Sequence, residues 1–339
     1  MGKKIIKIKA VKKAKKPLKL QDAIRMFLDA KEFENLSDKT VKYYDQNLKR
    51  FMTCLKEEFE LEEPTCEDFT AHLIVEYGKV LKARDKWDGH PDIVRQRKRD
   101  KISRNTYRTY INAVRVFGNW LNTKGYIEED ILNGIKLPKK EDKIIRILST
   151  DEIKTIFKEF NTKTELGLRN YLIVRLALDL GLRESSIVSL RVSGISLDKK
   201  EIQVLLKGGK WDYYAIDQTL RNRLREYINL YRSSREVESE EDKDMLFLNI
   251  NGKAITTNTI RQIFKRLKAK TGIKELGCHL LRHNFAANFI SKQGKSLEEL
   301  KGMLGHTTTR MSERYGNVAK MEKRVSKGHD SYLNSINVK

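Results

Sequence analysis

The feature of this sequence that most limits its possible folds is a charged stretch near the middle of the chain, which separates two regions of different hydrophobic pattern. Residues 138–150 begin with Pro138, are mostly charged over their first nine positions, and offer few side chains for a core. Segments of this composition commonly link domains. A single core rarely grows beyond about 250–300 residues, and the chain has 339. We therefore predict two domains joined by a linker over residues 138–150.

The region before the linker has the periodicity of α-helices. Apolar residues recur at intervals of three and four along residues 41–55 and again along residues 107–121, which places them on one face of each helix. Gly125 follows the second segment, where a glycine commonly ends a helix. We predict a helical domain over residues 20–137, preceded by a basic N-terminal arm over residues 1–19.

The region after the linker also contains helices. Ser149 and Glu152 form a capping-box pattern that starts a helix. Residues 168–180 repeat leucine every four positions, as a buried helix face does. Further helices are expected over residues 220–231, 257–270, 280–292 and 297–304.

Short strands interrupt these helices. They are predicted over residues 195–197, 201–206 and 211–216. Gly208 and Gly209 lie between the last two, where a hairpin turn requires positive φ angles. The expected fold is mainly α with a small antiparallel β-sheet, in two domains. The second, α+β domain spans residues 151–325, and a C-terminal tail spans residues 326–339.

The charge of the chain points to an acidic partner. The formal net charge is +23, and the nine lysines of residues 1–19, unaccompanied by acids, supply +9 of it, leaving +14 on the rest. Such an excess attracts nucleic acid strongly and in a salt-dependent manner. No stretch approaches the roughly 20 apolar residues that span a bilayer, so we expect no membrane partner.

One basic run lies in a polar segment between the two long helical patterns. It comprises Arg95, Arg97, Lys98, Arg99 and Lys101. Two interpretations stand side by side. The run is either a solvated surface, as most charge runs are, or a loop or helix start that contacts DNA phosphates.

The cysteines and the N-terminal sequence indicate the cellular compartment in which we expect the protein to act. Cys54, Cys66 and Cys278 show no CxxC spacing, and an odd number argues against a disulfide framework. No apolar core of a secretory signal follows the first lysines. We expect a cytoplasmic protein, or a virus-encoded one that acts in the host cytoplasm or nucleoid.

Four short stretches concentrate side chains suited to phosphate chemistry. They are Gly181–Arg183, Lys207–Lys210, His279–His283 and Leu304–His306, the last followed by Tyr315. Two guanidiniums can hold a phosphodiester through paired hydrogen bonds, and fixed cations stabilise the charge that develops in phosphoryl transfer. A tyrosine hydroxyl can act as a covalent nucleophile, with His and Lys moving protons. No acidic metal-binding cluster or nucleotide-binding glycine pattern accompanies them, so we expect no metal and no cofactor.

In this order, the residues resemble the catalytic signature of the tyrosine recombinase/integrase family. The most specific segments are HLLRHNFAANFI and MLGHTTTRMSERY, and TYRTYINAVRVFGNWLNTKGYI is similar to the family's first domain. The resemblance covers nearly the whole chain. It implies a helical core-binding domain that binds DNA over residues 20–137 and a DNA breaking-rejoining catalytic domain over residues 151–325.

The resemblance also implies a role for each matched residue. Arg183 and Arg282 are the phosphate clamps, and Tyr315 is the nucleophile that leaves a 3′-phosphotyrosine and a free 5′-hydroxyl. Rejoining needs no ATP, because the ester retains the bond energy. The resemblance implies no divalent metal in the chemistry.

The remaining roles concern protons and one hydrogen bond. Lys207 matches the lysine that protonates the leaving 5′ oxygen. Lys210, which we also expect to contact DNA, is the alternative if the turn is shifted. His279 matches the histidine that assists proton removal from the tyrosine. His306 matches the position that binds a non-bridging phosphate oxygen.

Two positions depart from the family pattern. Ser186 stands where an acidic residue is usual, three residues after the first arginine, and the neighbouring Glu184 should face elsewhere. Asp212 replaces the arginine of the usual hairpin pattern, which removes an expected phosphate contact.

The resemblance implies double-stranded DNA as the partner and a homotetramer on two DNA sites, with a monomer or weak oligomer when free. In the tail, Tyr332, Leu333 and Ile336 are predicted to contact a neighbouring subunit. The implied function is site-specific recombination for integration and excision or for dimer resolution. A type IB-like topoisomerase acting as a monomer, and a non-catalytic DNA-binding protein, are the alternatives.

Overall fold

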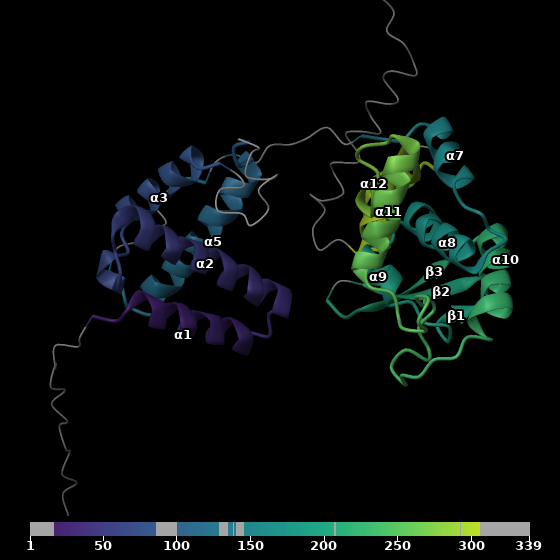
Figure 1. The fold of residues 1–339 in the computed structure, drawn as a ribbon, viewed down its shortest axis with the longest axis horizontal. Coiled ribbons are helices and arrows are strands. Elements are labelled where there is room, and N and C mark those ends of the chain that lie inside the picture. The colour runs from purple at the N-terminus through teal and green to yellow at the C-terminus, as the bar shows by residue number, and fades with distance from the viewer. Residues whose placement is uncertain are drawn as a thin grey trace, which may run out of the picture. The chain divides into compact units, whose positions relative to one another are not determined.

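The chain divides into two compact units, Met1–Lys143 and Ile144–Lys339, drawn from purple to blue and from teal to yellow in Figure 1. This computed structural model describes residues 17–85, 100–128, 135–137, 139, 146–206, 208–291 and 293–305. None of the helices within those ranges is long and apolar enough to cross a membrane.

The first unit is helical. Its helices are α1 (Leu20–Phe33), α2 (Asp38–Phe59), α3 (Ala71–Ala83) and α5 (Arg104–Thr123), with the short 3-10 helix η1 (Cys66–Asp68). They share one apolar core whose rings meet edge to face, as Phe27 and Phe117 do at 5.4 Å between centroids. Ser103 Oγ accepts the Thr106 N–H at the start of α5, and Gly125 follows its end with φ of 70°. The predicted glycine terminus is thus confirmed.

The second unit combines helices with one small sheet. Its helices are α7 (Thr150–Lys158), α8 (Glu165–Asp179), α9 (Glu184–Val188), α10 (Gln218–Tyr227), α11 (Thr257–Thr271), α12 (Cys278–Ser291) and α13 (Leu297–Leu304). The predicted capping box is confirmed: Ser149 Oγ accepts the Glu152 N–H at 3.1 Å, and the Glu152 carboxylate accepts the Ser149 N–H at 2.9 Å. The leucine repeat of residues 168–180 lies in the core, as predicted.

The sheet contains β1 (Ile195–Ser196), β2 (Glu201–Leu205) and β3 (Trp211–Ala215), all antiparallel and in that order. Each strand is one residue shorter than predicted. The Leu206 N–H donates to the Lys210 carbonyl at 2.7 Å and closes the turn. Gly208 and Gly209 have φ of 91° and 80°, which only glycine adopts without strain. The predicted fold class, mainly α with a small antiparallel sheet, is confirmed.

One helix ends earlier than expected. α10 stops at Tyr227, and the chain continues as the wider π-turn η2 (Ile228–Arg232) instead of a regular helix to residue 231. The Arg232 side chain is buried and donates to the Met245 carbonyl at 2.8 Å. The sequence pattern does not show this inward guanidinium.

Candidate active site

Three predicted catalytic positions and two predicted DNA contacts lie within the described residues. They are Arg183, His279, Arg282, Lys101 and Lys210. The others lie outside the described residues: Lys207, His306, Tyr315, Arg95, Arg97, Lys98, Arg99 and the tail residues Tyr332, Leu333 and Ile336.

Arg183 is positioned by a tight turn after α8. Gly181 has φ of 62°, a left-handed conformation. A Cβ at this position would lie 2.5 Å from Cδ1 of Phe285 on α12. Any other residue could therefore make this turn against α12 only by displacing its neighbours. Arg183 follows as the residue before the first turn of α9.

Arg282 lies on α12 and is buried, with 6% of its surface exposed. Its Nη1 donates to the Gly181 carbonyl at 2.6 Å, and its Nη2 donates to the Leu304 carbonyl at 2.7 Å. Arg183 Nη1 donates to the same Leu304 oxygen at 3.1 Å. Two guanidiniums from distant parts of the sequence therefore meet at one carbonyl.

The shared carbonyl lies at the C-terminal end of α13. Helix C-termini carry partial negative charge and attract cations, which favours both arginines at this position. Gly305 ends the helix with φ of 57°, and a Cβ there would lie 3.1 Å from Leu206 Cδ1. The hairpin turn after β2 and the end of α13 are thus neighbours, so the residues that precede Lys207 and His306 come together beside the arginines.

Tyr214 is a member of this cluster that the sequence interpretation did not identify. It lies on the buried face of β3, and its hydroxyl donates to the Met303 carbonyl in the last turn of α13. Burial, with a smaller contribution from the charge of Asp212, raises the pKa of Tyr214 to about 12, although Arg282 and Arg183 oppose the shift. The two-residue alternation of the strand indicates that the side chain is buried, but it does not indicate the contact.

His279 lies in the first turn of α12, one turn before Arg282, and its side chain is exposed. α12 begins at Cys278, two residues before the predicted start at residue 280, so His279 and Arg282 lie on the same helix. Their burial differs: the histidine faces solvent, and the guanidinium is held against backbone carbonyls.

The two departures from the family pattern have structural partners. Ser186 is 2% exposed, and its Oγ donates to the carbonyl of Leu205, the last residue of β2 before the turn. Glu184 faces α11, where it forms an ion pair with Arg261 Nε at 3.1 Å. Asp212 accepts the N–H of its neighbour Tyr213 at 2.9 Å.

The two described DNA-contact candidates differ in their surroundings. Lys210 is exposed in the hairpin turn. Lys101 Nζ lies 2.9 Å from the Asp85 carboxylate and also donates to the Ala83 carbonyl, so its ammonium joins the two ends of the segment between residues 85 and 101. No group of three or more His, Cys, Asp or Glu side chains within the described ranges is arranged to hold a metal ion.

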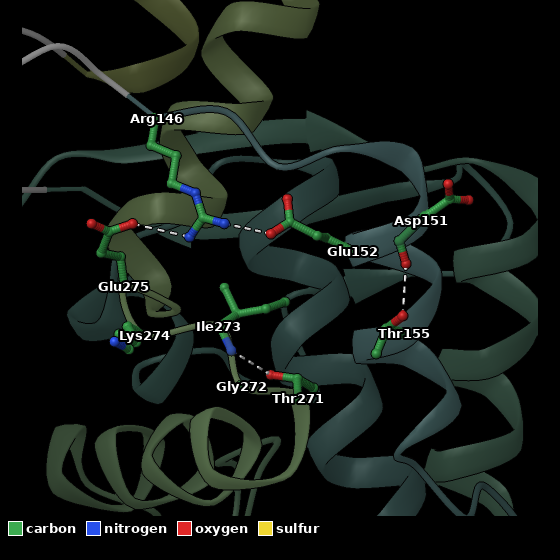
Figure 2. Close-up of a pocket in the computed structure, with 9 residues that line it drawn as sticks. All are labelled: Arg146, Asp151, Glu152, Thr155, Thr271, Gly272, Ile273, Lys274 and Glu275. Carbon is green, nitrogen blue, oxygen red and sulfur yellow. Dashed lines mark hydrogen bonds and ion pairs between the residues drawn. The ribbon is translucent and has the colours of Figure 1, made fainter.

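A cavity of about 490 Å³ lies elsewhere in the second unit. Figure 2 shows Arg146 between the carboxylates of Glu152 and Glu275, while the Asp151 carboxylate points away from it. None of the predicted catalytic residues that the structure describes lines this cavity, which is bordered by Arg146, Asp151, Glu152, Thr155, Thr271, Gly272, Ile273, Lys274 and Glu275.

Known proteins share both sequence and fold with this chain. Tyrosine recombinase XerC of Bacillus subtilis (strain 168) is 26% identical over 305 residues, which cover 89% of this chain and 93% of the relative. The structure of XerH site-specific recombinase bound to palindromic difH substrate has a TM-score of 0.66 and 18% identity, covering 86% of this chain and 80% of that one. The structure of a lambda integrase tetramer bound to a Holliday junction has a TM-score of 0.64 and 14% identity, covering 89% of this chain and 78% of that one.

A family model supplies the assignment. Residues 146–322, more than half of the chain, match the model of the phage integrase family. The chain therefore belongs to the phage integrase family, the tyrosine recombinases, whose members cleave and rejoin DNA at specific sites.

Proposed function

We propose that this chain recombines double-stranded DNA at specific sites through a covalent 3′-phosphotyrosine intermediate formed by Tyr315. The observation that supports this most is the convergence of Arg183 and Arg282 on the Leu304 carbonyl, at 3.1 Å and 2.7 Å. Two fixed guanidiniums at one point are suited to binding the non-bridging oxygens of a single phosphodiester.

In this proposal, the arginines stabilise the transition state. Negative charge accumulates on the phosphate oxygens as the tyrosine attacks, and cations that are already oriented do not have to reorganise at that moment. The hydrogen bonds to Gly181 and Leu304 hold the plane of the Arg282 guanidinium before DNA arrives.

Proton transfer is assigned to the remaining residues. Tyr315 loses its hydroxyl proton with assistance from His279, and Lys207 protonates the 5′ oxygen as it leaves, with Lys210 as the alternative donor. His306 donates a hydrogen bond to a non-bridging oxygen. Rejoining reverses these steps: the 5′-hydroxyl attacks the phosphotyrosine ester, and the tyrosine oxygen leaves.

The proposal also covers DNA binding and the assembly of subunits on DNA. The net charge of +23 favours DNA, and we propose that Lys101, Lys210 and the run Arg95, Arg97, Lys98 and Arg99 contact its phosphates. We propose a homotetramer on two DNA sites, formed from monomers or weak oligomers, as lambda integrase is a tetramer on a Holliday junction. The domain limits proposed are residues 20–137 and 151–325, joined by a linker over residues 138–150. The expected setting is the cytoplasm, or the host cytoplasm for a viral protein.

The test begins by selecting a duplex that the full-length protein binds from a random-sequence pool. This duplex is then nicked close to the cleavage position, so that the strand end diffuses away after attack. We expect a covalent protein–DNA complex on a denaturing gel, formed equally in excess EDTA. Tyr315→Phe should abolish it, whereas the matched control Tyr332→Phe should retain it. Loss of the complex in Tyr332→Phe alone would assign the nucleophile to that residue.

The same protein preparations separate the alternatives. Recombinant products from a plasmid carrying two copies of the selected site support the proposal. Relaxation of any supercoiled plasmid without recombinants indicates a type IB-like topoisomerase. Binding without any covalent complex indicates a non-catalytic DNA-binding protein.

A further inference from the structure

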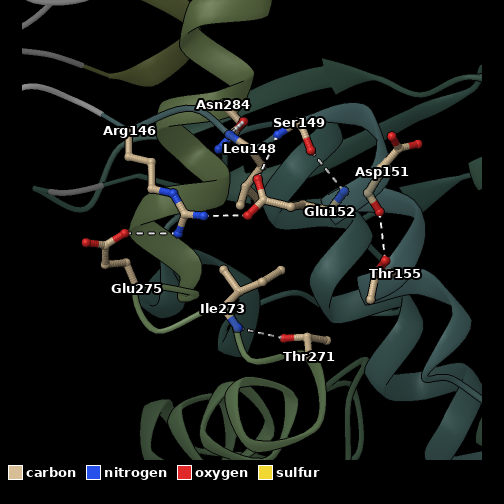
Figure 3. A network of polar contacts seen from close by, with 10 residues as sticks. All are labelled: Arg146, Leu148, Ser149, Asp151, Glu152, Thr155, Thr271, Ile273, Glu275 and Asn284. Carbon is tan, nitrogen blue, oxygen red and sulfur yellow. Dashed lines mark hydrogen bonds and ion pairs between the residues drawn. The ribbon is translucent and has the colours of Figure 1, made fainter.

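Asn284 bridges two segments that are distant in the sequence. It lies on α12, two residues after Arg282, and is fully buried. Its Oδ1 accepts the Leu148 backbone N–H at 2.7 Å (Figure 3). Its Nδ2 donates to the Leu280 carbonyl at 2.7 Å. Both ends of one amide are therefore satisfied, one on each segment.

Leu148 belongs to the segment Arg146–Ser149, through which the described chain enters the second unit. Leu148 itself is 5% exposed, so its N–H needs a partner inside the protein. The rest of the segment is also held by side chains. Arg146 forms ion pairs with Glu152 and Glu275, and the Ser149 backbone N–H donates a hydrogen bond to the Glu152 carboxylate (Figure 3).

The Asn284 amide attaches this entry segment to the turn of α12 that carries Arg282. The bond to Leu280 spans one helical turn, residues 280–284, and Arg282 lies in the middle of that turn. A shift of the entry segment would therefore move the backbone of Arg282 directly. Buried polar groups bonded on both sides resist such a shift, because breaking either bond leaves an unsatisfied group.

We propose that Asn284 is a positioning residue, which holds α12 against the entry segment so that the Arg282 guanidinium stays aligned for the phosphate. This inference rests on the proposed recombinase function. It assigns to Asn284 no contact with DNA and no part in proton transfer.

The test compares Asn284→Leu with wild type in the full-length protein. Leucine has the same branching and the same number of side-chain heavy atoms as asparagine but can make neither hydrogen bond, so the attachment is lost while the side chain keeps a similar shape. Asn288→Leu is the matched control, because it makes the same change one turn further along α12 at a half-buried position. The measurements are the single-turnover rate of covalent complex formation on the selected nicked duplex and the Kd for the intact duplex.

We expect Asn284→Leu to slow covalent complex formation about 10- to 100-fold, the loss typical of a misplaced catalytic group. Its Kd should stay within about twofold of wild type, because most phosphate contacts are unchanged. Asn288→Leu should match wild type in both. Hydrogen exchange should increase in residues 146–149 and 278–285 and stay unchanged in the rest of the unit, which a general loss of stability would not produce.

Asn284→Asp is the second variant and covers the case in which the leucine variant does not fold. Burial favours the protonated carboxyl, which accepts from the Leu148 N–H and can donate its O–H to the Leu280 carbonyl, so this variant should retain cleavage within a few-fold of wild type. The inference is overturned if Asn284→Asp cleaves more than about tenfold more slowly than wild type. It is also overturned if Asn284→Leu cleaves at the wild-type rate. A wild-type protein that forms no covalent complex overturns the proposed function, and this inference with it.

Discussion

Replacing Gly181 by alanine should destabilise the second unit more than the backbone conformation alone explains. Gly181 has φ of 62°, and an added Cβ would lie 2.5 Å from Phe285 Cδ1 and 3.0 Å from Leu304 Cδ2. Both neighbours are buried side chains, and the Gly181 carbonyl also holds Arg282. The Phe285 side chain, the turn or α12 must therefore shift.

Two contributions set the size of the effect. A left-handed conformation costs a non-glycine residue about 1–2 kcal/mol, and overpacking a filled core costs about 1–3 kcal/mol. The expected loss is therefore about 2–5 kcal/mol. In a unit of this size, each kcal/mol corresponds to about 2–4 °C, so Tm should fall by roughly 4–20 °C.

Gly272→Ala is the matched control, because Gly272 has a similar φ of 71° but no atom within 4 Å of an added Cβ. It should lose only the conformational part, about 1–2 kcal/mol. Differential scanning calorimetry of the full-length variants compares the two, and covalent complex formation should fall in Gly181→Ala alone. A Gly181→Ala protein that melts no lower than Gly272→Ala would refute the reasoning, since it would show that Phe285 yields without cost.

Three further predictions concern groups near the same site. Ser186→Ala removes the buried hydrogen bond to the Leu205 carbonyl and should lower the free energy of unfolding by about 1–2 kcal/mol, measured by urea denaturation. Burial raises the pKa of Tyr214 from 10.0 to about 12, so the stability that it contributes is present below pH 10 and is lost as the pH rises toward 12. Tyr214→Phe should lose stability less steeply over that range, and an unchanged slope would contradict this. The pKa of the buried Cys278 thiol is raised to about 12, so iodoacetamide at neutral pH should leave it unmodified in the native protein and modify it in guanidinium, as checked by mass spectrometry.

Much of the fold follows from local patterns in the sequence. The leucine repeat of residues 168–180, the capping box of Ser149 and the paired glycines of the hairpin each depend on neighbours a few residues away, and each is found where it was expected. Arg232 lies just beyond the predicted helix of residues 220–231, and its burial depends on the Met245 carbonyl, 13 residues away. No local pattern in the sequence indicates that contact.

The sequence singles out the two arginines that meet at the Leu304 carbonyl, but it does not show what holds them. Arg183 and Arg282 stand in recognisable segments, but the oxygen that they share belongs to the backbone of Leu304, whose side chain gives no sign of it. Tyr214 and Asn284 bind backbone groups of segments far away in the sequence. Such contacts depend on how the elements pack, which periodicity and spacing do not specify.

Because the oxygen shared by the two arginines is a main-chain atom, no amino-acid replacement at position 304 deletes it. A lineage can exchange Leu304 for another apolar residue and still keep this acceptor. The insertion or loss of one residue in α13 is different, because it would turn the terminal carbonyl by about 100° and displace it by about 1.5 Å along the axis. Replacement of Leu304 therefore keeps the shared acceptor in place, whereas a change in the length of α13 does not.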